Sequence, residues 1–232
     1  ATRAFAALAS RAGAELRTAT DVQLALRDGI AQGVAADGRV DPAGAVVVTA
    51  GPWTSTLLDP TGRWRPIHSV WGVVAAVRLA DPPRHVLEEA EIDIEPEDGR
   101  PVAIDDPTSS EFGFSLVTAD GSSALGSTFL DAEPAAQGLV ETLRERGARF
   151  VPALADADVA GVRSCARPVS ADRRPLVGAV PGIERAYVAA GHGPWGISTG
   201  PATARLVADL IAGGAPAIPA GFDPGRFGAV GG

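Results

Sequence analysis

The amino-acid sequence predicts a mixed α/β protein that combines an α/β part with an α+β part. The α/β part is indicated by two short apolar strands, at residues 45–50 and 187–190, that are each followed by a glycine. The second strand leads into a glycine-rich turn and a helix, which is the strand–turn–helix order of α/β proteins. The α+β part is indicated by residues 66–130, where long strands follow one another, and by a helical pattern at 134–147.

The first fifth of the chain is predicted to contain a helix and three strands. Residues 2–14 form a helix in this interpretation, because their apolar residues recur on one side. Strands are predicted at 15–20 and 22–28, and a turn-rich stretch follows at 29–38. The strand at 45–50 has no polar alternation before its end, which is typical of a central strand covered on both faces.

The middle of the chain, residues 62–168, is predicted to form a mixed, largely antiparallel sheet with flanking helices. Its predicted strands lie at 66–79, 112–118, 124–130 and 159–167, and its helix lies at 134–147. The second and third strands are expected to pair around the turn Asp120-Gly121-Ser122. An acidic run at 88–98 is interpreted as a solvated surface rather than a metal site.

The stretch 186–213 carries the most informative local pattern. After the strand, the turn GHGPWG has three glycines and a proline, so its backbone can approach a ligand closely. Ala204, Val207, Ala208 and Ile211 then recur near the helical period. Free N–H groups at the start of this helix favour a phosphate or another partial negative charge. Taken alone, the pattern equally suits a purely structural strand–turn–helix.

Composition excludes several classes of function. A net charge of −8 argues against nucleic acid as a partner, because phosphate binding needs clustered Lys and Arg. No apolar run approaches the roughly 20 residues that span a bilayer. The single Cys165 excludes an internal disulfide, and no spacing of His, Asp or Glu predicts a metal site. The expectation is a cytoplasmic protein with a small-molecule partner.

Three segments in a fixed order carry a family resemblance: VVTAGPW at 47–53, RPVSADRRPLVG at 167–178 and AAGHGPWGI at 189–197. Together with the closing FDPGRF at 222–227, they resemble the D-amino-acid oxidase-like FAD-dependent oxidoreductases. That family includes glycine oxidases, sarcosine oxidases and D-amino-acid dehydrogenases. The resemblance implies a partial FAD-binding dinucleotide domain at 1–61 and 169–232 and a substrate domain at 62–168.

One family feature is missing from the chain. Family members begin with a strand, a G-x-G-x-x-G turn and a helix that hold the FAD pyrophosphate, and nothing before Ala50 matches this fingerprint. We therefore interpret the chain as the C-terminal portion of a longer enzyme. Stable binding of FAD is then expected to need a missing N-terminal segment or a second chain.

Arg167 is the candidate catalytic residue. Pro168 restricts its backbone, and its planar fork of donors matches a carboxylate. The alternative is a surface arginine that pairs with a carboxylate such as Asp172. The resemblance implies the first reading, because the arginine of the family's R-P pair binds the substrate carboxylate above the flavin.

The resemblance also implies which residues contact FAD. Those expected to do so through their backbone are Gly191, His192, Gly193, Pro194, Trp195, Gly196, Ile197 and Ser198, and Val22, Ala50 and Gly51 are expected on the adenine–ribose side. Cys165 lies seven residues before Asp172, as does the cysteine that carries FAD covalently in sarcosine oxidases. The next residues match the non-covalent branch, and a small buried side chain is the alternative for this cysteine.

The implied activity is oxidation of an amino acid or a related amine with a carboxylate, by hydride transfer to flavin N5. The alternative is a catalytically incompetent fragment or subunit of such an enzyme, which needs the missing N-terminal segment or a second chain for FAD binding.

Overall fold

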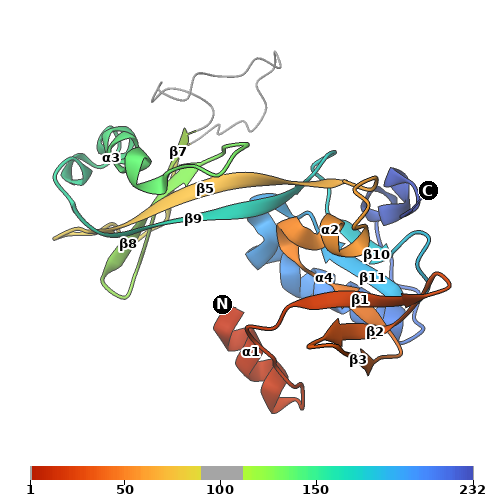
Figure 1. The fold of residues 1–232 in the computed structure, drawn as a ribbon. Helices are drawn as coiled ribbons and strands as arrows, with labels where there is room; N and C mark the ends of the chain where they lie inside the picture. Colours follow the sequence, from red (N-terminus) through yellow and green to blue (C-terminus); the bar gives the residue numbers. More distant parts are fainter. Residues whose placement is uncertain (1, 90–111, 232) are drawn as a thin grey trace. The chain divides into compact units, whose positions relative to one another are not determined.

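The computed structural model describes residues 2–89 and 112–231 of the chain (Figure 1). The chain divides into two compact units. The first unit holds Ala1–His68 and Pro168–Gly232, and the second holds Ser69–Arg167. No helix within the described ranges is long and apolar enough to cross a membrane. Assignment of the two units to cofactor and substrate stays a prediction.

The first unit begins with helix α1 (Thr2–Arg11) and a three-stranded antiparallel sheet. The sheet has the order β1-β2-β3, with β1 at Val22–Arg27, β2 at Ile30–Ala36 and β3 at Arg39–Pro42. The predicted helix and the predicted strand at 22–28 are confirmed. The stretch predicted to be rich in turns also contains β2, and its two Asp-Gly pairs are the two-residue hairpin turns of a meander. The pairing of these strands was not predicted.

The predicted strand at 15–20 is wrong. These residues have no regular structure, and those from Glu15 to Ala19 are exposed. The Arg17 guanidinium donates to Glu15 Oε1 at 3.1 Å and to Asp41 Oδ2 at 2.6 Å. The segment contains too few apolar side chains to bury a strand face, so polar contacts at the surface hold it instead.

A second sheet in the first unit has the order β10-β11-β4. Strand β10 (Leu176–Ala179) runs antiparallel to β11 (Ala186–Ala190), and β11 runs parallel to β4 (Val46–Val48). In the sheet as described, β4 is therefore an edge strand, which corrects the expectation of a central strand covered on both faces. Two of its valines are buried, but Val47 is 38% exposed.

Two helices follow the parallel strands of this sheet: α2 (Thr54–Leu58) after β4 and α4 (Gly196–Ile211) after β11. The core of the first unit is apolar and is formed by Ala31, Val46, Val48, Leu58, Trp64, Ile67, Leu176, Val180, Ile183, Ala186, Val188 and Ala190. Helix α4 is confirmed. Of its four periodic apolar residues, however, only Val207 is buried, and the rest of the stripe is exposed.

The second unit is built on a five-stranded sheet of order β6-β7-β8-β5-β9. Its strands are β5 (Ile67–Arg78), β6 (Leu87–Glu88), β7 (Phe112–Ala119), β8 (Ser122–Thr128) and β9 (Asp158–Ser170). The predicted hairpin is confirmed, since β7 and β8 pair antiparallel around Asp120 and Gly121, which both have positive φ. The mixed α/β fold class is confirmed as well.

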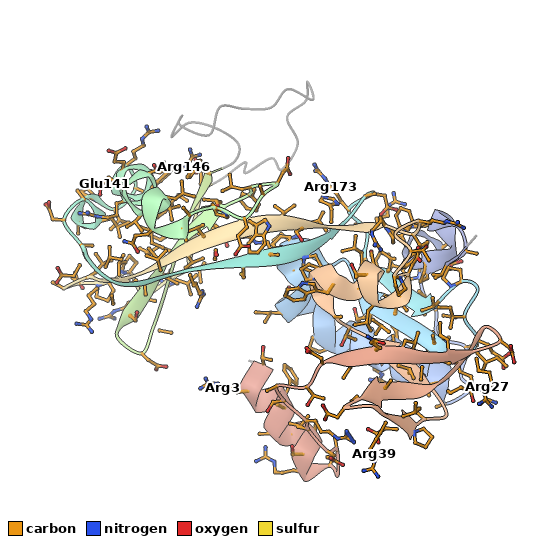
Figure 2. All side chains as sticks on the ribbon, viewed as in Figure 1. Arg3, Arg27, Arg39, Glu141, Arg146 and Arg173 are labelled. Atoms are coloured by element: carbon orange, nitrogen blue, oxygen red, sulfur yellow. The ribbon has the colours of Figure 1, made fainter. Side chains whose placement is uncertain are left out.

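Helix α3 (Val140–Ala148) starts later than the predicted 134–147, because a short 3₁₀ turn over 136–139 precedes it. Its Leu143 joins the core of the second unit with Phe112, Phe114, Leu116 and Leu125 of the hairpin. Arg146 on the same helix (Figure 2) pairs with Glu89, with both nitrogen–oxygen distances at 2.9 Å. Glu89 is therefore a structural ion-pair partner and not part of a solvated surface. Positions 90–98 of the acidic run lie outside the described residues.

Candidate functional site

The carboxyl ends of β4 and β11 define one edge of the sheet in the first unit. The two strands are parallel neighbours, with Val48 opposite Val188, so the residues that follow them lie at the same edge. A Gly-Pro-Trp 3₁₀ turn follows each strand, at Gly51–Trp53 and Gly193–Trp195. In both turns the glycine has a positive φ, 57° and 55°, which favours glycine. Ligands of α/β sheets bind at such an edge.

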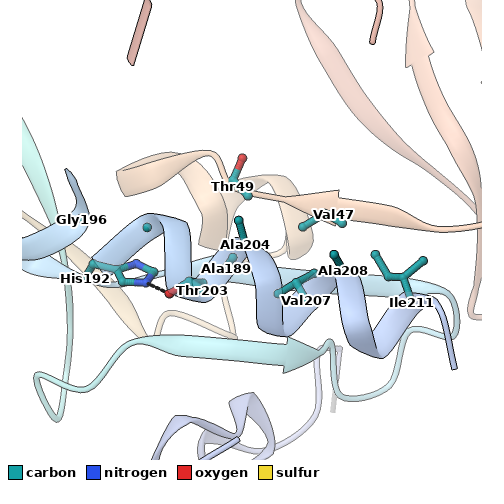
Figure 3. Close-up of a pocket in the computed structure, with 11 residues that line it drawn as sticks. Val47, Thr49, Ala189, His192, Gly196, Thr203, Ala204, Val207, Ala208 and Ile211 are labelled. Carbon is teal, nitrogen blue, oxygen red and sulfur yellow. Dashed lines mark hydrogen bonds between the residues drawn. The ribbon is translucent and has the colours of Figure 1, made fainter. Parts of the chain in front are cut away.

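A cavity of about 430 Å³ lies beside this edge (Figure 3). It is lined by small and apolar residues of β4, β11 and α4, with three polar ones: Val47, Thr49, Ala189, His192, Gly196, Gly200, Thr203, Ala204, Val207, Ala208 and Ile211. Its lining contains no lysine, arginine or carboxylate. The cavity is thus suited to apolar groups and offers no charge to a pyrophosphate.

His192 occupies the end of this cavity. Its Nε2 shares a hydrogen bond of 2.9 Å with Thr203 Oγ1 on α4 (Figure 3). Burial lowers the pKa of the imidazole below its ordinary value of 6.5, because desolvation disfavours the charged ring. The side chain is therefore a neutral group fastened to α4. Because its ring is engaged with Thr203, His192 has its backbone left for contact with the cofactor. Such a contact through the backbone was predicted from the sequence and stays a prediction.

The N-terminus of α4 has no side-chain cap among the described residues. The Ser198 and Thr199 hydroxyls instead donate to the Trp195 carbonyl, at 2.9 and 2.8 Å. Its first N–H groups can thus serve an anion or an electron-rich ring carbonyl, which fits the flavin portion of FAD. Trp195 and Ile197 are 62% and 73% exposed beside them.

Of the other residues predicted to contact the cofactor, some lie at this edge of the sheet and one does not. Ala50 and Gly51 follow β4 at the edge just described, and a Cβ built on Gly51 meets no described atom within 4 Å. Gly191 is buried, and a Cβ there would lie 3.2 Å from Leu176 Cδ1. Val22 instead begins β1, in the other sheet of this unit. The structure thus gathers the two glycine turns at one edge and does not bring Val22 to that sheet.

Arg167 lies on β9 in the second unit. Its guanidinium packs over the Phe129 ring, with Cζ 4.8 Å from the ring centroid. Its Nη1 donates to the Thr128 carbonyl at 2.7 Å, and its Nη2 donates to Ser127 Oγ. Burial lowers the pKa of the guanidinium from its ordinary value, but arginine remains charged in proteins.

This arrangement leaves donors of Arg167 available. The structure gives partners to Nη1 and Nη2, out of five N–H groups that a guanidinium carries. No carboxylate within residues 2–89 or 112–231 forms an ion pair with it. A half-buried cation without an acidic partner is costly, and an incoming carboxylate offsets that cost.

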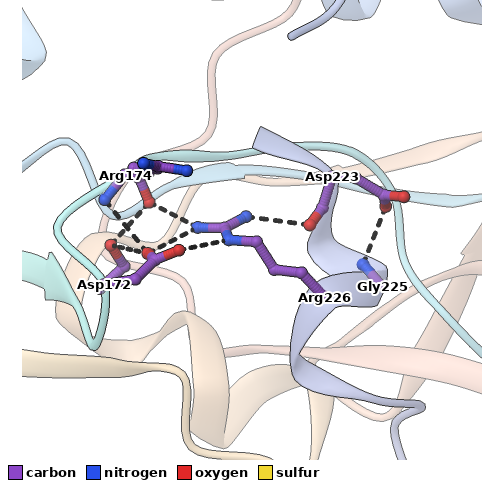
Figure 4. A network of polar contacts seen from close by, with 6 residues as sticks. Asp172, Arg174, Asp223, Gly225 and Arg226 are labelled. Carbon is purple, nitrogen blue, oxygen red and sulfur yellow. Dashed lines mark hydrogen bonds and ion pairs between the residues drawn. The ribbon is translucent and has the colours of Figure 1, made fainter. Parts of the chain in front are cut away.

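Asp172 is the partner of a different arginine, which corrects the alternative reading of Arg167. The Asp172 carboxylate accepts from Arg226 Nε at 2.7 Å and from Arg226 Nη2 at 2.9 Å (Figure 4). It also accepts from the Arg174 backbone N–H at 3.1 Å. Arg226 lies in the closing FDPGRF segment, and no role for it was predicted from the sequence. Only the fold shows that this segment returns to the turn after β9.

Cys165 is exposed on β9, two residues before Arg167, so the two side chains share a face of the strand. The alternative of a small buried side chain is therefore wrong. A covalent link to FAD at this residue stays a prediction.

The first unit thus has a sheet edge with two glycine turns that suits a flavin, and the chain also carries an arginine that suits a carboxylate. These are features of a flavin-dependent enzyme that acts on carboxylates. The FAD dependent oxidoreductase family (DAO) matches residues 1–210, and the chain belongs to this family. Glycine oxidase of Pseudomonas aeruginosa is 31% identical over 227 residues, which covers 94% of this chain and 56% of that protein. The family and its glycine oxidases are FAD-dependent.

Solved structures agree with the fold. Glycine oxidase from Geobacillus kaustophilus matches with a TM-score of 0.77 at 28% identity, over 97% of this chain and 56% of that one. Iminodiacetate oxidase from Chelativorans sp. BNC1 matches with a TM-score of 0.73 at 27% identity, over 96% and 58%. The chain spans about half the length of the curated relatives that it matches.

Proposed function

We propose that this chain forms part of a cytoplasmic FAD-dependent enzyme that oxidises an amino acid, or a related amine bearing a carboxylate. The observation that carries the proposal is the half-buried Arg167 guanidinium, which has N–H groups left over and no acidic partner in the described chain. The names of two similar proteins point the same way, since glycine and iminodiacetate are both amines with a carboxylate.

In this proposal Arg167 binds the substrate carboxylate and so orients the α-carbon. Backbone N–H groups among residues 191–198, where Pro194 has none, would hold the flavin and would stabilise negative charge on its ring. When FAD is bound, its chemistry is hydride acceptance at N5 from the substrate α-carbon, which leaves an imine that water hydrolyses. His192 takes no part as a base, because a neutral amine gives up hydride without one and the ring is engaged with Thr203.

A substrate panel with two variants tests this function. The chain is loaded with FAD, and loss of the flavin absorbance band is followed with amino acids and with the matching amines that lack the carboxylate. Arg167→Met is expected to lower kcat/KM for the amino acids about 100-fold, the equivalent of about 3 kcal/mol for charged hydrogen bonds. Arg163→Met, an exposed arginine on the same strand, is the matched control. An equal loss for amino acids and amines contradicts the carboxylate role.

The exposed apolar lining of the cavity beside β4, called the groove below, favours a second candidate function. Val47, Ala204, Ala208 and Ile211 all line the cavity and are all exposed, although their sequence pattern is that of buried residues. Strand β4 also has an unpaired edge in the described sheet. On this reading the chain is a subunit or fragment without activity of its own. A missing N-terminal segment or a second chain then covers the groove and supplies the site for the FAD pyrophosphate.

An absorption spectrum separates the two candidates. A yellow protein, or a colourless one that takes up added FAD, supports the enzyme, whereas a chain that cannot retain FAD supports the incomplete subunit. Colour that stays with the denatured chain assigns the covalent link to Cys165, and Cys165→Ser then abolishes it. Colour lost on denaturation contradicts that link.

A further inference from the structure

We infer that Gly72 on β5 is a positioning residue for Arg167: the missing side chain at position 72 creates the space in which the guanidinium lies. The inference rests on the proposed function, in which that guanidinium receives a substrate carboxylate. It adds a positioning residue on β5, a strand to which the proposed function assigns no residue.

The first support is the close approach between the two residues. A Cβ built on Gly72 would overlap Nη1, Nη2 and Cζ of Arg167, and no other described atom is as near. These three atoms therefore occupy the space that a side chain at position 72 would fill. A guanidinium so placed is held on one side by β5 and stacks on the Phe129 ring.

The second support is the cost of glycine in this strand. Strand β5 is otherwise rich in valine and alanine, with Trp71 beside the glycine. The φ of Gly72 lies outside the left-handed region, so its backbone conformation does not require glycine. Glycine inside a strand weakens it, and close approach of another group is the usual reason for its presence.

The third support is that hydrogen bonds hold β5 in place on both sides of Gly72. Trp71 and Leu130 exchange two backbone hydrogen bonds, N–H to carbonyl, at 2.6 and 3.0 Å. The Thr128 hydroxyl bridges the same strand, since it donates to the Trp71 carbonyl at 3.1 Å and accepts from the Val73 N–H at 2.9 Å. These bonds tie the strand on both sides of Gly72 to the segment that also holds Arg167. A side chain at position 72 must therefore displace the guanidinium and not the strand.

Gly72→Ala tests the inference, with Gly161→Ala as the matched control. Gly161 lies on β9 in the same sheet, and a Cβ there meets no described atom within 4 Å. The probe is benzoate, a simple carboxylate, titrated into the full chain and followed by calorimetry. Gly72→Ala is expected to weaken benzoate binding at least about tenfold, because the guanidinium loses its geometry, and Gly161→Ala is expected to bind as the wild type does. Equal benzoate affinity of Gly72→Ala and the wild type would overturn the inference.

A second readout follows the guanidinium itself. Because Arg167 stacks on Phe129, ring-current effects should displace the NMR signal of its Nε–H in the wild type. That displacement is expected to collapse in Gly72→Ala and persist in Gly161→Ala. A wild type that binds no carboxylate contradicts the proposed function, while the NMR signal still decides whether Gly72 positions the arginine. An unchanged signal in Gly72→Ala overturns the positioning.

A double variant covers the case in which Gly72→Ala does not fold. Removing the guanidinium with Arg167→Ala removes the overlap, so Gly72→Ala in that background is expected to fold with at least the thermal midpoint of Arg167→Ala alone. If the added methyl group is equally damaging without the guanidinium, its partner is not Arg167 and the inference fails.

Discussion

Asp172 and Arg226 lie on segments far apart in the sequence and form a two-pronged ion pair, with nitrogen–oxygen distances of 2.7 and 2.9 Å. Arg226 belongs to the 3₁₀ turn Pro224–Phe227 near the end of the described chain (Figure 4). The same guanidinium donates to the Arg174 carbonyl at 2.7 Å and to the Asp223 carbonyl at 2.9 Å. One arginine therefore fastens the closing segment to the turn that links β9 and β10.

Asp172→Asn is expected to lower the free energy of unfolding by about 1 kcal/mol. The pair is partly exposed but two-pronged, so its contribution lies at the upper end of the range for surface ion pairs. Urea denaturation at neutral pH measures the loss. Asp209→Asn on α4, an exposed carboxylate, is the control and is expected to change little. A double-variant cycle with Arg226→Gln should show that the two losses are not additive. Additive losses would mean that the pair contributes nothing as a pair.

Stability is expected to fall on the acid side because of Asp59. This carboxylate is only 2% exposed and accepts from the Thr61 hydroxyl at 2.6 Å and from the Trp64 N–H at 2.6 Å. These bonds lower its pKa from 3.8 to about 2. A lowered pKa in the fold means that the contribution is complete above the unfolded value and is lost as the pH falls from 3.8 to about 2.

Asp59→Asn tests whether this carboxylate is the source of the loss of stability at acid pH. The amide cannot ionise, so the variant is expected to be less stable than the wild type at neutral pH and to lose less stability between about pH 4 and pH 2. Thermal midpoints at a series of pH values give the comparison. Asp21→Asn, at an exposed position, should keep the acid dependence of the wild type. An unchanged slope in Asp59→Asn would rule out this carboxylate as its source.

His192 is expected to titrate below 6.5, because burial of its ring disfavours the charged form. A histidine pKa that is lowered in the fold favours the uncharged form, so the fold loses stability as the pH drops through the unfolded value of 6.5. NMR titration of the imidazole measures the pKa directly, in the folded chain and in the urea-unfolded chain. A value in the folded chain at or above the ordinary 6.5 would contradict the burial argument.

Sequence order predicted the edge of the candidate site well, for a physical reason. The two motifs follow residues 48 and 190, at the ends of adjacent parallel strands. The carboxyl ends of such strands lie at the same edge of the sheet, whatever the packing of the rest of the chain. The Gly-Pro-Trp turn occurs after both strands, and the family resemblance implied cofactor contact at Gly51 in the first copy as well as in the second copy. The exposure of Val47 was not predictable, because it depends on what lies beside β4 and not on the strand's own residues.

The surroundings of Arg167 were likewise beyond the sequence pattern. The residue itself follows from its R-P pair, but Gly72 and Thr128 reach it only through the order of β8, β5 and β9 in one sheet. Nothing local in a strand of valines marks its glycine as a contact to a residue on another strand. Long-range strand order is set by the packing of the whole core, which short motifs do not encode.

The meander that the sequence analysis missed contains its own strict requirement, at Gly33. In β2 this residue has a φ of 151° and pairs with Pro42 of β3. A Cβ at this position would overlap the Asp41 carbonyl, which is backbone and cannot swing away. Gly33→Ala is therefore expected to cost more than about 2 kcal/mol, from backbone strain and lost pairing together.

The matched control is Gly44→Ala. Its φ is ordinary, and a Cβ there meets no described atom within 4 Å, so the change is expected to be neutral or slightly stabilising. Urea midpoints compare the two variants, and hydrogen exchange of the Val34 and Asp41 amides reports on the pairing of β2 with β3. Fast exchange confined to Gly33→Ala is the expected outcome. Wild-type stability in that variant would show that the strand tolerates a side chain at position 33, contrary to the geometry described.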